Sequence, residues 1–428
     1  MGESKPDWLP MWNSLGIDIA KHDQLLNALP AAFKAIYIEP QKNRPKGMDF
    51  WDFVVGDIHG IRVSELVDAK KKGRLVVGTF CLYVPDEIII ALDGISIGLC
   101  GGTNFSNYAV EGVLPVNVCP LIKSALGFSL GRICPYYLVT DFLIGETTCD
   151  GKKKAWEILG KNKEVYVIEL PQCKDRPQAR IHFIAELKAL ANKLEMAARK
   201  KLTTENLNMA IAKIGQKRAL LRQLNETRKA DPVPISGKDA LLVFQVAFYD
   251  DPDRQIQMLG KLVEELQQRI KAGEGVVAKG TKRILVSGTP MAIPNWKLHH
   301  VIESSGAIVV AEETCTGTRY FQGEVKITGN TVDALLENIA DRYLSINCAC
   351  FTPNEGRKQD LLRLVKEYRV DGVILYTLSF CTNYEMEAQT LEKELKAAKI
   401  PVLSITTDYS SEDLAQLKTR VEAFLETL

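Results

Sequence analysis

The stretch that decides the fold is Gly145-Glu146-Thr147-Thr148-Cys149-Asp150-Gly151-Lys152-Lys153-Lys154. The apolar run 141–144 before it is typical of a buried parallel strand, and residues 152–159 after it predict the first turns of a helix. Cys149 is therefore expected at the carboxyl end of a strand, where open α/β sheets place their ligand sites. The helix start beside it would favour the thiolate, because N–H groups and the positive end of the helix dipole face the sulfur. Such a thiolate suits a metal or cluster, although a single cysteine in this setting is more often just half-buried.

The other cysteines recur in similar settings. Four of them follow or end apolar runs that predict strands: Cys81, Cys100, Cys315 and Cys381. Two precede a proline, which suits the first position of a helix: Cys119 and Cys134. Cys348 and Cys350 form a C-x-C pair in a predicted loop, whereas Cys173 has no such context. Because iron–sulfur clusters are held by thiolates, cysteines gathered at strand ends and helix starts indicate an iron–sulfur site.

The composition restricts the partners and the compartment. With 54 basic and 53 acidic side chains, the chain has no net field that would attract nucleic acid or anionic lipid. No apolar stretch approaches the ~20 residues of a membrane span, and residues 1–7 do not look like a secretory signal. We therefore expect a cytoplasmic protein. In that compartment its 10 cysteines favour metal binding or redox chemistry over disulfides.

The alternation of apolar runs and helical patterns predicts an α/β protein of two Rossmann-like parallel-sheet lobes separated by a helical segment. We divide the chain into a helical and irregular N-terminal segment (1–74), a first cysteine-rich lobe (75–175), a helical middle segment (176–282) and a second lobe (283–428). The predicted strands are Val76–Phe80, Ile95–Leu99, Phe142–Ile144, Val165–Leu170, Ile284–Ser287, Ile308–Ala311, Val373–Tyr376 and Val402–Ile405. Since the cysteines fall at strand ends in both lobes, facing lobes would bring them together in one cleft.

Other metal and cofactor chemistries fit the spacings poorly. Zinc sites and thioredoxin-like redox sites use a C-x-x-C pair, which the chain lacks, and its five histidines have no ligand spacing. The sequence contains no G-x-x-x-x-G-K-S/T phosphate loop and no G-x-G-x-x-G motif after a strand. We therefore do not expect this chain to bind ATP or a nicotinamide cofactor itself.

Several of these stretches resemble the 2-hydroxyacyl-CoA dehydratase/benzoyl-CoA reductase superfamily. They are Thr79–Glu87, Asn117–Ser124 and Gly145–Lys154 in the first lobe, and Glu313–Phe321 and Asp371–Ile374 in the second. The resemblance covers the chain from about residue 75 to its C-terminus. It implies a catalytic subunit in which three cysteines hold one [4Fe–4S] cluster, and by motif these cysteines correspond to Cys119, Cys149 and Cys381.

The chain departs from that pattern by carrying extra cysteines at predicted site positions: Cys100, Cys134, Cys315, Cys348 and Cys350. This surplus resembles the double-cubane cluster proteins, a branch of the superfamily, and implies an [Fe8S9] cluster in which six irons each take one cysteine. The two lobes look like a weak duplication, so we assign three ligands to each. They are Cys100, Cys119 and Cys149 from the first lobe, then Cys315, Cys381 and either Cys348 or Cys350 from the second, with Cys134 as a possible substitute.

The resemblance also implies a function: ATP-dependent, low-potential reduction of a small molecule, with electrons supplied by a separate ATP-hydrolysing iron–sulfur activator. A homodimer is expected from the family alone. Glu146 and Lys123 are candidate proton donors because both lie within a few residues of proposed ligands, although a salt bridge or a helix cap explains either equally well. The alternatives are an (R)-2-hydroxyacyl-CoA dehydratase subunit with one [4Fe–4S] cluster, and a non-catalytic cluster-binding scaffold.

Overall fold

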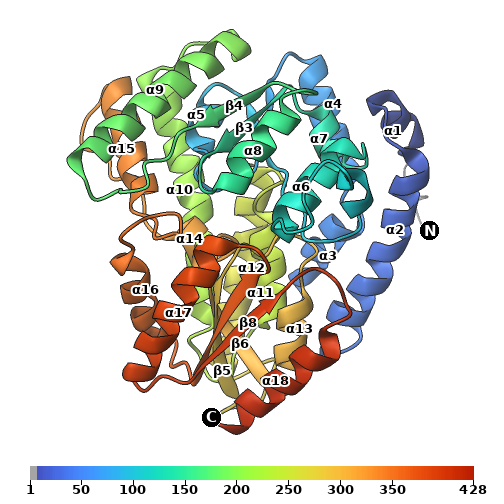
Figure 1. Ribbon diagram of the computed structural model, residues 1–428, viewed down its shortest axis with the longest axis vertical. Coiled ribbons are helices and arrows are strands. Elements are labelled where there is room, and N and C mark those ends of the chain that lie inside the picture. The colour runs from blue at the N-terminus through green and yellow to red at the C-terminus, as the bar shows by residue number, and fades with distance from the viewer. Residues whose placement is uncertain (1–6) are drawn as a thin grey trace.

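Two four-stranded parallel sheets form the frame of the molecule, seen in the computed structural model of Figure 1. The structure describes residues 7–428, so the first six residues of the N-terminal segment, where no secretory signal is expected, lie outside the described residues. The first sheet has the order β2-β1-β3-β4 and the second β6-β5-β7-β8. The strands are β1 (Val76–Thr79), β2 (Ile95–Gly98), β3 (Phe142–Glu146), β4 (Val165–Ile168), β5 (Lys282–Gly288), β6 (Ala307–Glu313), β7 (Gly372–Leu378) and β8 (Val402–Thr407). The predicted α/β fold with two Rossmann-like lobes is confirmed.

The strands are rich in apolar residues because helices cover parallel sheets on both faces. Every residue of β1, β3, β6 and β7 is buried. The helices of the first lobe are α5 (Asp86–Ala91), η2 (Asn107–Val110), α6 (Pro120–Leu130), α7 (Pro135–Val139) and α8 (Asp150–Leu159). Those of the second are α13 (Lys297–Ser304), α14 (Thr318–Phe321), α15 (Val332–Leu344), α16 (Glu355–Glu367), α17 (Thr382–Ala397) and α18 (Leu414–Glu426). In each sheet the chain runs outward on both sides of its first strand, and ligands of such sheets bind at the carboxyl ends beside this switch point.

The N-terminal segment wraps along one side of the molecule (Figure 1). Its helices are α1 (Leu9–Leu15), α2 (Ile19–Phe33), the π-helical turn η1 (Lys34–Ile38), α3 (Met48–Gly56) and α4 (Ile61–Lys71). The apolar patch 50–55 lies on α3, where Trp51 and Val55 are buried against the body. Phe53 of the same patch faces solvent.

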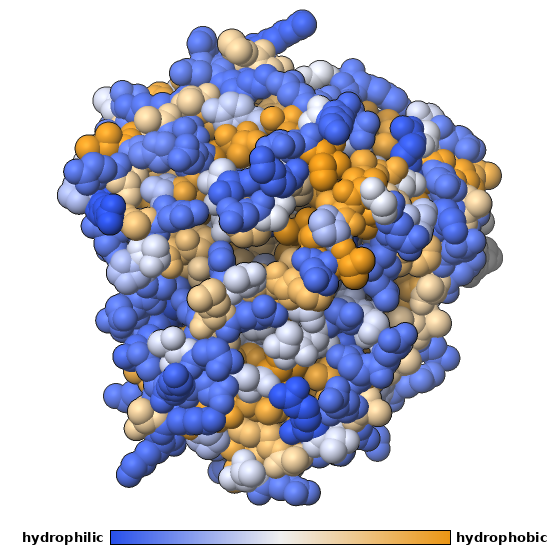
Figure 2. Space-filling view, viewed as in Figure 1, coloured by the Kyte–Doolittle hydropathy of each residue, from blue (hydrophilic) through white to orange (hydrophobic). Residues whose placement is uncertain are grey.

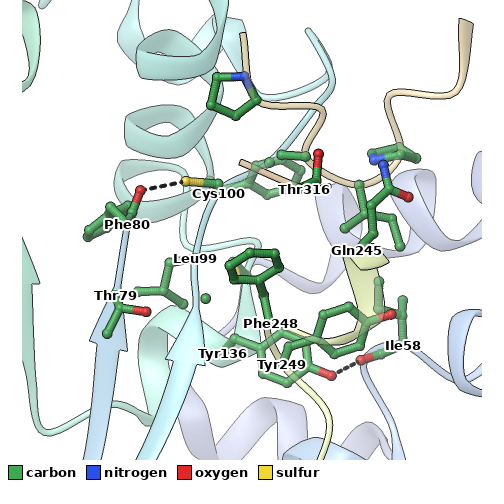
Figure 3. Close-up of a pocket in the computed structure, with 18 of the residues that line it drawn as sticks. Ile58, Thr79, Phe80, Leu99, Cys100, Tyr136, Gln245, Phe248, Tyr249 and Thr316 are labelled. Carbon is green, nitrogen blue, oxygen red and sulfur yellow. Dashed lines mark hydrogen bonds between the residues drawn. The ribbon is translucent and has the colours of Figure 1, made fainter. Parts of the chain in front are cut away.

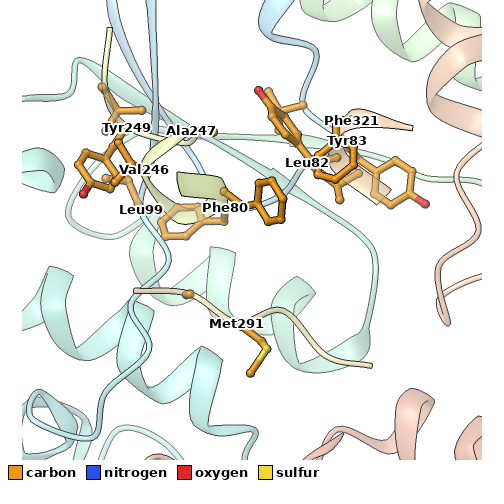
Figure 4. Close-up of a cluster of buried hydrophobic side chains, with 14 of the residues drawn as sticks. Phe80, Leu82, Tyr83, Leu99, Val246, Ala247, Tyr249, Met291 and Phe321 are labelled. Carbon is orange, nitrogen blue, oxygen red and sulfur yellow. The ribbon is translucent and has the colours of Figure 1, made fainter. Parts of the chain in front are cut away.

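The middle segment consists of four helices: α9 (Pro177–Ala198), α10 (Thr204–Thr227), α11 (Gly237–Val246) and α12 (Pro252–Ala272). All ten residues of α11 are buried, so this helix passes through the interior. Figure 4 shows Val246 and Tyr249, at its end and just after it, beside Phe80 and Leu99 of the first lobe. Within residues 7–428, no helix combines the length and the apolar composition that crossing a membrane requires. The division of the chain at residues 74, 175 and 282 stays a prediction.

The two lobes meet through loops at the carboxyl ends of their strands. The Gly102 N–H donates to the carbonyl of Ile293 at 2.8 Å. A Cβ at position 102 would lie 2.0 Å from the carbonyl oxygen of Ala292, so this close approach requires glycine. The Tyr83 hydroxyl donates to the carbonyl of Ile346 at 3.4 Å, and its ring packs edge-on against Phe351. Loops of both lobes therefore share one interface.

Helix α10 links both lobes through two buried ion pairs. Arg218 contacts Glu87 of α5 at 2.6 Å, and Arg228 pairs with Glu312 of β6. Burial disfavours the Glu87 carboxylate, but Arg218 and Arg342 hold its pKa below the ordinary value. The Tyr343 hydroxyl also donates to Glu87, at 2.8 Å. The helical middle segment is thus anchored to both lobes.

We expect Arg218→Met to lower the free energy of unfolding by about 3–5 kcal/mol, because the buried Glu87 carboxylate loses the cation that contacts it directly. Urea unfolding of the two proteins measures the difference. The control is Lys213→Met on the same helix as Arg218. It removes an exposed ion pair with Asp253 of α12 and should change the free energy of unfolding by at most about 1 kcal/mol. Equal effects of the two substitutions would contradict the anchoring role of Arg218.

Candidate metal centre

Most of the cysteines lie on loops that leave the carboxyl ends of the strands, whereas Cys134, Cys348 and Cys350 lie between helices. All ten are free thiols. Four of them stand directly before a helix, at the N-caps of α6, α7, α8 and α17: Cys119, Cys134, Cys149 and Cys381. The sulfur of Cys149 accepts a hydrogen bond from the Lys152 amide at 3.4 Å. Cys149 therefore occupies the predicted position between strand and helix.

The cysteines form two groups. The first, which we call the Cys119 group, contains Cys119, Cys149 and Cys381. Hydrogen bonding with the Cys381 thiol lowers the pKa of Cys119 to about 7 although burial opposes the charged form. Burial raises the pKa of Cys149, and the nearby Cys119 thiolate acts in the same direction. The Asn383 side chain donates to the carbonyl of Thr148 at 3.3 Å, which holds the start of α17 against the loop after β3. The three thiols that the resemblance assigned to one cluster thus lie together across the lobes.

The second group of cysteines, which we call the Cys315 group, contains Cys81, Cys315, Cys348 and Cys350. Hydrogen bonding with Cys350 lowers the pKa of Cys348 to about 5, and Arg319 also favours this thiolate. Burial raises the pKa of Cys315 to about 12. Burial likewise raises the pKa of Cys81, and the charges of Glu146 and Cys315 add to this effect. This group also joins the lobes, because Cys81 follows β1 and the other three belong to the second lobe.

Arg319 and Tyr384 hold the Cys315 group from the second lobe. The Arg319 guanidinium donates to the Cys315 sulfur at 3.6 Å and pairs with the buried carboxylate of Glu313. The Tyr384 hydroxyl lies 3.5 Å from the Cys348 sulfur. Since Glu313 also pairs with Arg357 at 3.0 Å, the cation beside the thiols is fixed by a buried network. Arg319 therefore has a structural role that includes contact with a candidate ligand.

Lys152 lies between the two groups. Its ammonium pairs with the fully buried carboxylate of Glu146 and donates to the carbonyl of Phe80 at 3.3 Å. Burial opposes its charge, but Glu146 and the thiols of Cys81 and Cys100 raise its pKa well above the ordinary value. Glu146 accepts a second hydrogen bond from Thr148 at 2.8 Å, and its Oε2 atom has no partner. Glu146 therefore lies beside Lys152, between the two groups of cysteines.

The remaining predicted site residues fall in three places. The Cys100 thiol donates to the carbonyl of Phe80 at 3.1 Å and lies close enough to Cys119 for the charge of that thiolate to act on it. Burial raises the pKa of Cys134 to about 11, and the charged group that acts on it most is Lys163 rather than another cysteine. The Lys123 ammonium donates to the carbonyl of Val116, in an exposed loop. The role of each as ligand or proton donor stays a prediction.

Cys81 is the residue that our sequence-based ligand set left out. The signal was present, because Cys81 follows an apolar strand directly. The duplication argument favoured Cys100 instead, because it matched the stretch 94–100 of the first lobe to the stretch 306–315 of the second. The structure places Cys81 beside Cys315 and Cys350, both more than 200 residues away along the chain.

The donor set suits a cluster better than a single ion. No three His, Cys, Asp or Glu side chains in the described part of the chain converge closely enough to hold one metal ion. A cluster does not need such convergence, because each thiolate binds a separate iron. The buried cations Lys152 and Arg319 lie beside the sulfurs and can balance thiolate charge. The residues present therefore fit an iron–sulfur cluster.

Comparison with known proteins places the chain in a family. Residues 81–428 match the family model described as 2-hydroxyglutaryl-CoA dehydratase, D-component. The chain therefore belongs to this dehydratase family, as its motifs predicted.

Individual relatives agree with this assignment. The chain is 35% identical to the putative dehydratase subunit YjiM of Escherichia coli K12 over 365 residues, which is 85% of this chain and 94% of the relative. It is 23% identical to the (R)-phenyllactyl-CoA dehydratase beta subunit of Clostridium sporogenes, over 84% of this chain and 93% of the relative. It is 21% identical to one of the subunits of benzoyl-CoA reductase from Thauera aromatica, over 83% of this chain and 91% of the relative. The relatives are subunits of dehydratases and of a reductase, which confirms the prediction of an enzyme of this superfamily.

Proposed function

We propose that the chain is the catalytic subunit of an iron–sulfur reductase and carries an [Fe8S9] double-cubane cluster between its lobes. The observation that carries the proposal is the presence of two separate groups of cysteines, each made from both lobes. Cys119, Cys149 and Cys381 would ligate one cubane, and three of the four thiols of the Cys315 group would ligate the other. A single [4Fe–4S] cluster would use the first group alone and would leave four gathered thiols without a role.

The protein's own residues prepare this site in two ways. Lys152 and Arg319 supply positive charge beside the thiolates in a poorly solvated interior, where charge pairing is stronger than in water. Glu146 lies fully buried next to Lys152 with one free carboxylate oxygen, and this makes it the better placed of the two candidate proton donors. When bound, the cluster supplies low-potential electrons to the substrate. The hydrogen bonds and burial of the cysteines set that potential.

The electrons would come from a separate ATP-hydrolysing iron–sulfur activator. The chain has no phosphate loop of its own, and the relatives are named as subunits of larger enzymes. Apolar side chains are exposed close to the Cys119 group: Val116 is 82% exposed and Phe380, directly before Cys381, is 47% exposed. Phe380 also adopts a left-handed backbone with φ of 64°, a strained conformation that often marks functional sites. Figure 2 shows apolar residues gathered on this face over α6. We propose that the activator docks on this face. We also propose that the protein is a homodimer and that it is cytoplasmic.

A second function is supported by the names of the relatives. An (R)-2-hydroxyacyl-CoA dehydratase subunit would hold one [4Fe–4S] cluster on the Cys119 group, next to which the substrate thioester would bind. The two functions differ in iron content, since the dehydratase needs about four irons per chain.

Iron and acid-labile sulfide per chain, measured on protein purified without oxygen, test the proposal. About eight irons, with sulfide slightly in excess of iron, are expected for the double cubane. About four would favour the dehydratase. A chain that carries almost no iron, in protein never exposed to air, would contradict both.

A further inference from the structure

A pocket of about 150 Å³ lies beside the Cys315 group, bounded by first-lobe strand ends, the loop after α11 and the second-lobe loop after β5. Cys81, Cys100, Cys315 and Lys152 line one part of it. In the view of Figure 3, Phe248 lies between Cys100 and the two tyrosines Tyr136 and Tyr249. The pocket therefore extends from the candidate metal centre into the apolar interior.

The outer wall of the pocket comes from the N-terminal segment. Leu25, Leu26 and Leu29 of α2 line it with one half-buried face of that helix, and Ile58 continues the wall. All four residues precede position 81, where the match to the family model begins. The wall is thus a feature of this chain's own N-terminal segment rather than of the matched family core.

The pocket offers almost no polar group to a ligand. The Tyr136 hydroxyl donates to the carbonyl of Ile58, and the Gln245 side chain is bonded to Met291 and Trp296 at 2.7 and 2.8 Å. Lys152 is paired with Glu146. Among the fully buried nitrogen and oxygen atoms of the lining side chains that the structure describes, the Tyr249 hydroxyl is the one without a hydrogen-bond partner. The His59 imidazole also lines the pocket, with its Nδ1 atom 2.9 Å from Nε2 of His22, and burial lowers its pKa well below the ordinary value, so it is uncharged. A charged group would lose its hydration here without gaining a counter-ion, which is strongly unfavourable.

From this we propose that the pocket binds a small, uncharged, apolar molecule, with at most one hydrogen-bonding group placed at Tyr249, and that α2 sets its upper size. Apolar cavities of about this volume stay dry and take up benzene or xenon. The inference rests on the proposed function, because a ligand in this pocket lies next to the thiols of the Cys315 group and is a substrate only if those thiols hold the cluster. It names the class of molecule that reaches them: uncharged, apolar and no larger than about a benzene ring.

Benzene binding to the full-length protein, purified without oxygen, tests the pocket. Calorimetry should show binding, and the Tm should rise with benzene concentration because the ligand stabilises the folded state. Benzoate, which has a similar ring and a charge, should bind at least 10-fold more weakly. Equal binding of benzoate and benzene would overturn the apolar assignment, and no binding of benzene would overturn the pocket as a site.

The size limit is tested by Leu26→Trp, which puts an indole into the outer wall and should weaken benzene binding at least 10-fold. Leu29→Phe is a milder second variant in case the first does not fold, and it should weaken binding in the same direction. The matched control is Leu9→Trp on the exposed face of α1, which should leave binding unchanged. Unchanged binding in both pocket variants would overturn the role of α2. Iron content, measured on the same samples, reports separately on the proposed function.

Discussion

Replacing Cys315 by alanine is expected to remove about half of the iron and leave the other half in place. Cys315 belongs to the group that also contains Cys81, Cys348 and Cys350, whereas Cys119, Cys149 and Cys381 form the other group. If each group holds one cubane, loss of one ligand destabilises its own cubane first. ATP-dependent reduction should fall by about 100-fold or more, because even changes outside the ligands cost 10–100-fold in activity.

Iron, sulfide and the visible absorption of the cluster measure this result. Cys173→Ala is the matched control, since Cys173 belongs to neither group. The Cys173→Ala protein should keep its full iron content. Cys149→Ala is the reciprocal variant and should lose the iron held by the Cys119 group. Full iron content in Cys315→Ala would contradict the double cubane and favour the single [4Fe–4S] cluster of a dehydratase.

The fold was predictable because its signals are local. A buried parallel strand needs only an unbroken apolar run, and most of the eight strands have one, as in Val373–Tyr376, although Ser96 interrupts β2 and Ser404 interrupts β8. The helix boundaries also follow local chemistry: α12 starts at Pro252, and the Asp251 side chain caps its first turn. Such features depend on neighbours a few residues away and survive without knowledge of the tertiary structure.

The candidate site was predictable only where local structure determines the position of a side chain. Cys149 was assigned correctly to a strand–helix junction because strand, turn and helix are adjacent in sequence. The neighbours of Cys81 depend instead on how two lobes pack, and no spacing in the sequence reports that contact. The same limit applies to Lys123, which is close to Cys119 in sequence but directs its ammonium to Val116.

The packing of the lobes also explains why the site concentrates charge. Parallel strands end at one edge of each sheet, and the loops after these edges meet in contacts such as the Gly102 N–H with the carbonyl of Ile293. Thiols from several strand ends are therefore buried in the same interior, where thiolates are poorly solvated. Without compensation the thiolates would be unstable there, and Lys152 and Arg319 are the buried cations that the described structure places beside them.

Lys152→Met is expected to move the reduction potential of the metal centre to more negative values by on the order of 100 mV. A buried positive charge favours the state with the added electron, and Lys152 lies close enough to act on both Cys81 and Cys100. A unit charge roughly 5–10 Å away contributes ~2–3 kcal/mol at an effective dielectric constant of about 20. For one electron, about 59 mV corresponds to a tenfold change in equilibrium, so this energy gives the stated shift.

A redox titration followed by electron paramagnetic resonance measures this potential. Lys153→Met is the matched control, because Lys153 is one residue further along α8 and pairs with the exposed Asp150. It should leave the potential unchanged. Lys152→Met also leaves Glu146 buried without its cation, so Lys152→Met combined with Glu146→Gln separates the two charges, and its potential should lie between wild type and the single variant. Equal potentials in the two lysine variants, or a shift to more positive values, would mean that Lys152 does not stabilise the reduced centre and that its pairing with Glu146 serves the fold alone.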